Sequence, residues 1–171
     1  MTWWLPSDPE DIRAECWLHP AATLYLESLL MPDMTVIEHG CGGSTLWLSE
    51  RVNKTRSFDN DREWIANVEK NAGKNSEIVF YKDIPYISKK CDLLFIDGNN
   101  QDRPAWLMAS QKLVKPGGII VLDNAERPHY QVGRKHLLTF CHAPLTIAAT
   151  TGLGKFVVTE FYRVKGGANW I

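Results

Sequence analysis

Acidic side chains stand at the ends of five short apolar segments, where β-strands are expected to stop. They are Glu38, Asp59, Asp83, Asp97 and Asp123. In a parallel sheet with helices on both faces, ligands bind at the carboxyl ends of the strands, so most of these side chains are expected to line one cleft. A carboxylate repels a phosphate and attracts an ammonium or sulfonium group. The set therefore favours a positively charged ligand.

A glycine-rich turn, residues 39–43, follows the first of these segments. Glycine lets the backbone turn sharply and approach a ligand closely. Asp59 lies 21 residues after Glu38, about the spacing at which an acid binds a ribose hydroxyl, so the ligand is expected to carry a nucleoside. Thr45 stands where a dinucleotide-binding turn has its third glycine, and no P-loop lysine follows. Together with the charge of Glu38, this favours S-adenosylmethionine.

Strands alternate with helices along the chain, which predicts an α/β fold: a doubly wound, mostly parallel sheet. The segment 115–118, Lys-Pro-Gly-Gly, is expected to form a tight turn. The last two strands, 145–149 and 155–164, are expected to form a hairpin. Helices are expected near 19–31, 44–52, 60–71, 103–114 and 131–140.

Composition predicts one domain spanning residues 1–171, with residues 1–18 as an N-terminal leader. Lys and Arg total 19 and Asp and Glu total 20, a balance that argues against a nucleic-acid partner. No apolar stretch reaches the ~18 residues of a membrane helix, and the N-terminus lacks the basic region of a signal peptide. The four cysteines show no metal-binding or disulfide spacing, so a cytoplasmic protein with reduced thiols is expected.

The segment Glu38–Thr45 resembles the first motif of class I S-adenosylmethionine-dependent methyltransferases, in the variant where Ser-Thr follows the glycines. The resemblance continues through Phe58-Asp59, Asp83, Phe95–Gly98 and Lys115–Gly118, and it covers about residues 19–164. It implies a Rossmann-like, seven-stranded sheet with a C-terminal antiparallel hairpin. The cofactor-binding residues that it implies are Glu38, Gly40, Cys41, Gly42, Ser44, Thr45, Asp59, Asn60, Asp83, Ile84, Asp97 and Gly98.

The resemblance assigns parts of the cofactor to these residues. The backbone of residues 40–42 would approach the methionine part, with Glu38 near its ammonium group. Asp59 would bind the ribose hydroxyls, unless it only caps a helix. Asp83 would accept from the adenine amino group, with Ile84 against the ring; the alternative for Asp83 is a turn-initiating residue.

Methyl transfer requires a positioned acceptor and, for a hydroxyl, a base that removes its proton. The run Asp97–Asn100 lacks the Pro-Pro-aromatic pattern of enzymes that methylate exocyclic amines and the Pro-Cys of cytosine-C5 enzymes. This leaves an oxygen of a small molecule as the acceptor. Asp97 and His129 are the catalytic candidates, because Asp97 and Gly98 would lie under the transferred methyl and His129 follows the fifth strand.

A divalent cation is an alternative to a side-chain base. One subset of small-molecule O-methyltransferases holds such a metal with residues that match Asp97, Asp123 and Asn124, and hard oxygen ligands of this kind suit Mg²⁺. Those enzymes often place a lysine where this chain has Asn100. Arg103 is interpreted as a solvated surface residue, with a clamp on an acidic substrate as its alternative.

Two other functions stay open. One is a nicotinamide-dependent oxidoreductase, and the other is a catalytically inactive module that binds S-adenosylmethionine. The three indoles of the leader, Trp3, Trp4 and Trp17, would close over the substrate site, cover a homodimer surface or pack against the edge of the sheet.

Overall fold

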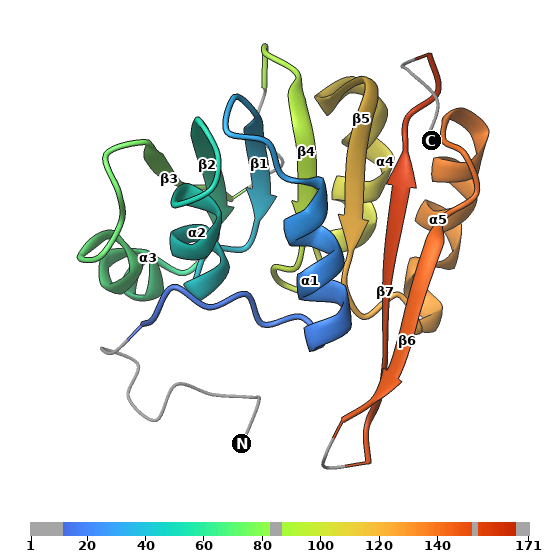
Figure 1. Cartoon of the computed structure of the whole chain (residues 1–171), viewed down its shortest axis with the longest axis horizontal. Helices are drawn as coiled ribbons and strands as arrows, with labels where there is room; N and C mark the ends of the chain where they lie inside the picture. Colours follow the sequence, from blue (N-terminus) through green and yellow to red (C-terminus); the bar gives the residue numbers. More distant parts are fainter. Residues whose placement is uncertain (1–11, 83–86, 152–153, 167–171) are drawn as a thin grey trace.

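The computed structural model describes residues 12–82, 87–151 and 154–166, and it is built around one seven-stranded sheet (Figure 1). The strand order is β3-β2-β1-β4-β5-β7-β6; β7 runs antiparallel to both of its neighbours, and the other pairs are parallel. The predicted doubly wound sheet with its C-terminal hairpin is therefore confirmed. The strands are β1 (Thr35–His39), β2 (Lys54–Asp59), β3 (Ser76–Phe80), β4 (Cys91–Ile96), β5 (Val114–Leu122), β6 (Leu145–Thr150) and β7 (Phe156–Arg163).

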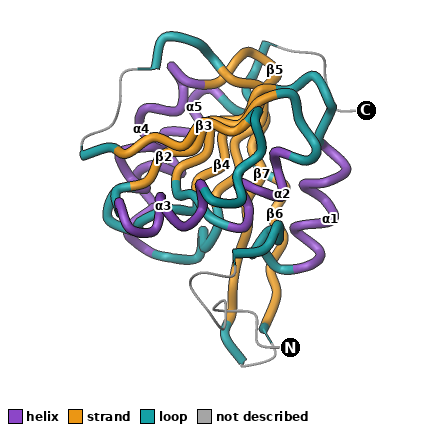
Figure 2. Tube along the Cα trace, turned by 90° about the vertical axis from the view of Figure 1, so that its left-hand side faces the viewer, coloured by secondary structure: helices purple, strands orange, loops and turns teal. Residues whose placement is uncertain are grey.

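Helices cover both faces of the sheet. Figure 2 shows α1 and α2 on one side and α4 and α5 on the other. The helix α3 packs with α2 through a third apolar cluster that includes Ile65 and Leu46. The helices are α1 (Pro20–Leu29), α2 (Gly43–Ser49), α3 (Arg62–Glu69), α4 (Arg103–Leu113) and α5 (Gln131–Phe140), with a short 3₁₀ helix η1 (Pro128–Tyr130) before α5.

The central strands are apolar on both faces because helices cover both. Side chains along a strand alternate between the two faces. In β4, Leu93 and Phe95 belong to the cluster on the α1–α2 side, whereas Leu94 and Ile96 belong to the cluster on the α4–α5 side. Burial of each such side chain contributes about 1.5–3 kcal/mol to the free energy of unfolding. The same alternation decides where the polar residues at the ends of the strands point.

The predicted tight turn at residues 115–118 lies within β5. Cys91 of β4 pairs with Val114, and the next pair is Leu93 with Ile119. The residues between Val114 and Ile119 therefore bulge out of the ladder. Gly117 adopts a φ of 78°, which glycine reaches without steric cost.

The N-terminal segment, residues 12–18, runs along the carboxyl-end side of the sheet (dark blue in Figure 1). Ile12 packs with Cys41. A Cβ atom on Gly43 would lie 2.6 Å from the carbonyl oxygen of Arg13, so this segment lies directly over the start of α2. Trp17 is 38% exposed, while Trp3 and Trp4 lie outside the described residues.

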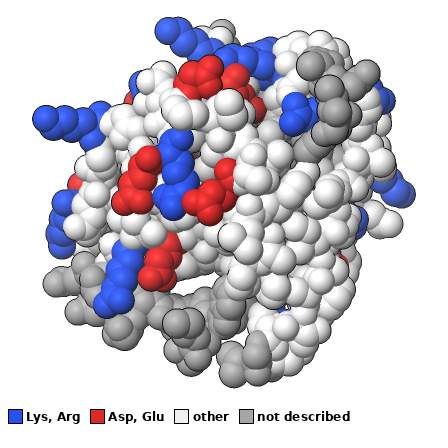
Figure 3. Space-filling model, in the orientation of Figure 1, with Lys and Arg blue, Asp and Glu red and all other residues white. Residues whose placement is uncertain are grey.

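Charged side chains of both signs lie next to each other on the face shown in Figure 3. Such mixing fits the net charge of −1. Within the described part of the chain, no helix is long and apolar enough to cross a membrane.

Candidate functional site

The carboxyl ends of β1 and β4 meet at two glycines. Gly40 follows β1 with a φ of 92°, and Gly98 follows β4. A Cβ atom on Gly40 would lie 2.5 Å from the Cα of Gly98, a distance that no side chain tolerates. The order of the strands reverses between β1 and β4, which is where ligands bind in sheets of this type. The structure thus brings together two of the segments that the sequence singles out.

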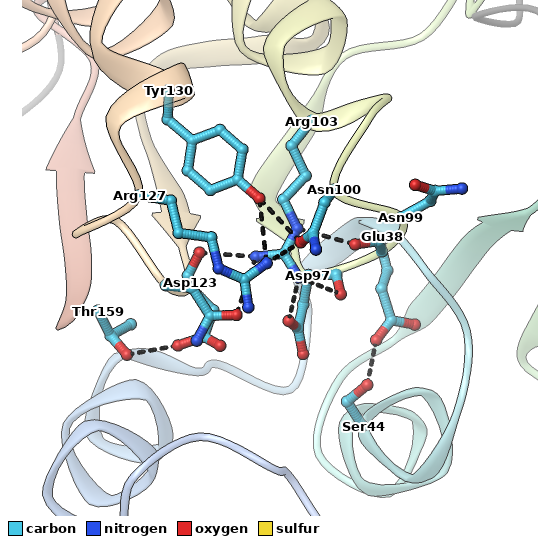
Figure 4. A network of polar contacts seen from close by, with 12 residues as sticks. Glu38, Ser44, Asp97, Asn99, Asn100, Arg103, Asp123, Arg127, Tyr130 and Thr159 are labelled. Atoms are coloured by element: carbon cyan, nitrogen blue, oxygen red, sulfur yellow. Dashed lines mark hydrogen bonds and ion pairs between the residues drawn. The ribbon is translucent and has the colours of Figure 1, made fainter. Parts of the chain in front are cut away.

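Glu38 supports the glycine turn from below. Its carboxylate accepts a hydrogen bond from the hydroxyl of Ser44 at 2.5 Å (Figure 4). It also accepts from the hydroxyls of Thr45 at 2.6 Å and Ser57 at 2.5 Å, and the side chain is fully buried. Burial raises the pKa of Glu38 to about 7, and the three hydrogen bonds oppose that rise only in part. The carboxylate that the resemblance places near the ammonium group thus holds three hydroxyls of the chain, and its role toward the cofactor stays a prediction.

Asp59 fixes the backbone of the same turn from the end of β2. Its Oδ2 accepts from the amide of Cys41 at 3.0 Å, and its Oδ1 accepts from the amide of Asp61 at 3.0 Å. On the other side of the turn, the indole of Trp64 donates to the carbonyl of Cys41 at 2.5 Å. The helix cap expected as the alternative role of Asp59 belongs instead to Asp61, which accepts from two amides at the start of α3.

A chain of side-chain hydrogen bonds links His39 to Asn60 beneath the turn. The Tyr81 hydroxyl and the Asn60 amide each donate to Oδ2 of Asp102 at 3.0 Å. Because the phenol has one proton, its oxygen accepts from His39 Nε2, 2.8 Å away. The imidazole stacks on Trp106, and burial lowers the pKa of His39 to about 3. His39 is therefore a neutral core residue.

Arg103 joins the end of β4 to the end of β5, and its interpretation as a surface residue is wrong. Its side chain is 4% exposed. Its guanidinium donates to the carbonyls of Gly98 at 2.8 Å and Asp123 at 2.7 Å, and to both the carbonyl and the carboxylate of Asp97, at 2.7 and 2.8 Å (Figure 4). The signal in the sequence was an arginine on the first turn of α4, six residues after Asp97.

Asp97 and Asp123 lie on either side of Arg103 but differ in exposure. The Asp97 side chain is 25% exposed, and one carboxylate oxygen is paired with the guanidinium. Asp123 is buried, and its carboxylate accepts from the Thr159 hydroxyl at 2.9 Å. Burial raises the pKa of both carboxyls, in Asp123 to about 7.

Comparisons with known proteins found similarity only among solved structures; no family model and no curated protein matches the chain. The N-methyltransferase NodS from Bradyrhizobium japonicum is 13% identical, with a TM-score of 0.70 over 85% of this chain and 94% of its own. An O-methyltransferase from Bacillus cereus, solved with S-adenosylhomocysteine, is 18% identical, with a TM-score of 0.69 over 86% and 82%. The tRNA (m1A58) methyltransferase TrmI from Aquifex aeolicus is 16% identical, with a TM-score of 0.67 over 91% and 72%.

This chain has the class I methyltransferase fold. The fold that the resemblance implies is thereby confirmed. Within this methyltransferase fold, the glycine turn and the Asp97-Gly98 pair occupy the switch point of the sheet. Asp83 and Ile84, the expected adenine-binding residues, lie outside the described residues.

The residues that would hold a divalent metal do not fit one. Oδ1 of Asp97 and Oδ1 of Asn124 already face the Arg103 guanidinium, at 2.8 and 3.5 Å. The Asp123 carboxylate accepts from the Thr159 hydroxyl instead. Across the described residues, no cluster of three or more His, Cys, Asp or Glu side chains could hold a metal ion.

His129 lies on η1, is exposed, and packs its ring edge-on against Tyr130, with 4.2 Å between ring centroids. Asn100, which stands where the resemblance to metal-dependent O-methyltransferases would place a lysine, accepts hydrogen bonds from Tyr130 at 3.0 Å and from Arg127 (Figure 4). These contacts join η1 to the loop after β4, which forms one side of the site. The role of His129 as a base stays a prediction.

Proposed function

We propose that this chain is an S-adenosylmethionine-dependent methyltransferase that transfers the methyl group to an oxygen of a small molecule. The observation that carries the proposal is the glycine turn at the switch point, fixed by Asp59 and held in contact with Gly98. The fold supports it, because the Bacillus cereus O-methyltransferase of the same fold was solved with S-adenosylhomocysteine.

Gly42 provides space for this ligand. Its backbone is extended, with a φ of 169°, a conformation that any residue adopts. A Cβ atom there would meet only Trp64, at an ordinary contact distance of 3.6 Å. The fold by itself therefore does not require glycine at this position. An approaching cofactor would require it, and this supports binding of the methionine part along residues 40–42.

Asp59 is the proposed partner of the ribose. Each carboxylate oxygen accepts one backbone hydrogen bond, which leaves lone pairs for the two ribose hydroxyls. Asn60 lies beside it and is held by Asp102. Asp83 and Ile84 remain the proposed contacts to adenine. Glu38 contributes indirectly, because it holds the hydroxyls of Ser44 and Thr45 in place.

Bound S-adenosylmethionine supplies a methyl group on a cationic sulfur. The chain must then align the acceptor oxygen with this methyl and receive the hydroxyl proton as the new carbon–oxygen bond forms. Asp97 is the proposed acceptor of that proton, because one of its oxygens is paired with Arg103 and its side chain is still 25% exposed. His129 is the second candidate for this role.

Oxygen on a small molecule is the proposed target because the sequence lacks the motifs for exocyclic amines and cytosine C5. The near-neutral charge does not favour a nucleic acid, although one protein of the same fold acts on tRNA. A nicotinamide cofactor would need a third glycine in this turn. The chain has Thr45 at that position, buried and hydrogen-bonded to Glu38.

Calorimetric titration with S-adenosylhomocysteine tests the proposal. Wild type is expected to bind, and Asp59→Ala is expected to bind at least tenfold more weakly, because two ribose contacts worth about 1.4 kcal/mol together are lost. Asp61→Ala is the matched control: it removes the cap of α3 and leaves the proposed ribose partner in place. Equal affinity of wild type and Asp59→Ala, or binding of NAD alone, contradicts the proposal.

The catalytically inactive alternative predicts the same binding of S-adenosylhomocysteine but no methyl transfer. Such a module would bind S-adenosylhomocysteine but would form none from S-adenosylmethionine with any acceptor. A panel of hydroxyl-bearing small molecules, assayed for S-adenosylhomocysteine release, separates the enzyme from the module.

A further inference from the structure

We propose that the Arg103 guanidinium is the resident cation of this site, so that the chain needs no divalent metal and Arg103 acts as a positioning residue for Asp97. The proposal goes beyond methyl transfer. Its test requires no cofactor, so its failure and that of the proposed function are distinguishable.

The hydrogen bonds of Arg103 account for all of its donors. A guanidinium carries five N–H groups. Nε donates to the Gly98 carbonyl, and Nη2 donates to the carbonyl and the carboxylate of Asp97. Nη1 donates to the Asp123 carbonyl at 2.7 Å and faces the Asn124 side-chain oxygen at 3.5 Å. No donor is left for a substrate, which makes Arg103 a positioning residue.

The acceptors around Arg103 are hard oxygens that converge from two strands. Asp97 and Gly98 follow β4, whereas Asp123 and Asn124 follow β5. Oxygens of this type would suit a divalent cation, but the guanidinium already fills the space between them. A second positive charge at the same point would be repelled by the first. The side chain that excludes the metal therefore also neutralises Asp97.

The position of Arg103 in the fold explains how it stays in place. It begins α4, directly after the loop that leaves β4. The ring of Tyr130 lies 5.8 Å from its guanidinium carbon, and the side chain is 4% exposed. Asn124 adopts a φ of 53°, which turns the chain at the end of β5. A buried cation with planar, forked donors can hold both strand ends at once, which a lysine cannot.

Binding of Mn²⁺ to the full chain, followed by electron paramagnetic resonance, tests the exclusion of metal. Wild type and Asp97→Asn are expected to bind Mn²⁺ equally, because any weak surface sites are common to both. A site that is present in wild type and lost in Asp97→Asn overturns the proposal. This measurement requires no variant of Arg103, so it decides the question even if such variants do not fold.

Substitution of Arg103 tests its role as the cation. Arg103→Ala is expected to gain one Mn²⁺ site. About 20–50 mM methylguanidinium is expected to restore at least half of the melting temperature that this variant loses, because a ligand that binds only the folded state stabilises it. Arg103→Lys is expected to keep Mn²⁺ out. Arg51→Ala, which loses the surface pairs with Glu27 and Glu50, is the control and should show neither effect. A folded Arg103→Ala protein that neither gains the site nor responds to methylguanidinium overturns the proposal.

Discussion

Gly40 and Gly98 are in backbone contact across two neighbouring strands: a Cβ atom on Gly40 would lie 2.5 Å from the Cα of Gly98. This contact joins the glycine turn after β1 to the Asp97-Gly98 pair after β4. The proposed cofactor and acceptor sides of the site thus share one rigid junction.

Gly40→Ala is expected to destabilise the protein by about 3 kcal/mol or more, because backbone strain at a φ of 92° adds to the steric overlap. Urea unfolding measures the loss. Gly154→Ala is a matched control: it has a φ of 76° and nothing within 4 Å of its Cβ, so it should lose only about 1–2 kcal/mol. Equal losses would show that the junction with Gly98 carries no packing constraint.

Gly42→Ala is expected to separate binding from folding. The added methyl meets only Trp64 at 3.6 Å, so the unfolding midpoint should stay close to that of wild type. Affinity for S-adenosylhomocysteine should fall by at least tenfold, about 1.4 kcal/mol, because the methyl takes space beside the methionine part. Calorimetry and urea unfolding of the same sample check both effects. Unchanged affinity would place the cofactor away from Gly42.

Glu38 is expected to make stability depend on pH. Its pKa of about 7 in the folded protein exceeds that of a free glutamate, so the folded state binds the proton more tightly. The contribution is fully present below about pH 4.5 and is lost as the pH rises through 7, by about 3 kcal/mol in total. Wild type should therefore lose stability relative to Glu38→Gln between pH 5 and pH 8. Parallel pH profiles of the two proteins in urea unfolding would contradict this.

Tyr81→Phe is expected to destabilise the protein by about 1–3 kcal/mol, because it leaves the buried Nε2 of His39 without an acceptor. The Nδ1 of that ring already lacks a partner among the described residues. Asn60→Ala is the matched comparison, because it removes an exposed donor to the same Asp102 carboxylate. Its loss should stay below about 0.5 kcal/mol. Thermal unfolding of both variants measures the difference. Similar losses would show that the hydrogen bond between His39 and Tyr81 adds no stability of its own.

Much of the fold follows from local patterns in the sequence. Apolar runs of four to eight residues between turn signals indicate buried strands, and their alternation with helices requires a parallel sheet. The carboxylates at the strand ends were found for the same reason, since strand ends are local features. The glycine turn was recognisable because glycine is needed where the backbone turns sharply, as at Gly40 with its positive φ.

Only the tertiary structure decided what the charged residues of the site do. Glu38 and His39 are adjacent, yet the alternation of β1 sends Glu38 under α2 and His39 onto Trp106 of α4. The sequence carries that alternation but does not say which helix covers which face. Arg103 is the clearest case: whether it is solvated or buried depends on carbonyls from β4 and β5, strand ends that lie apart in the chain and meet only in the folded sheet. Burial and hydrogen-bond partners are properties of that assembly, so they cannot be read from residue types alone.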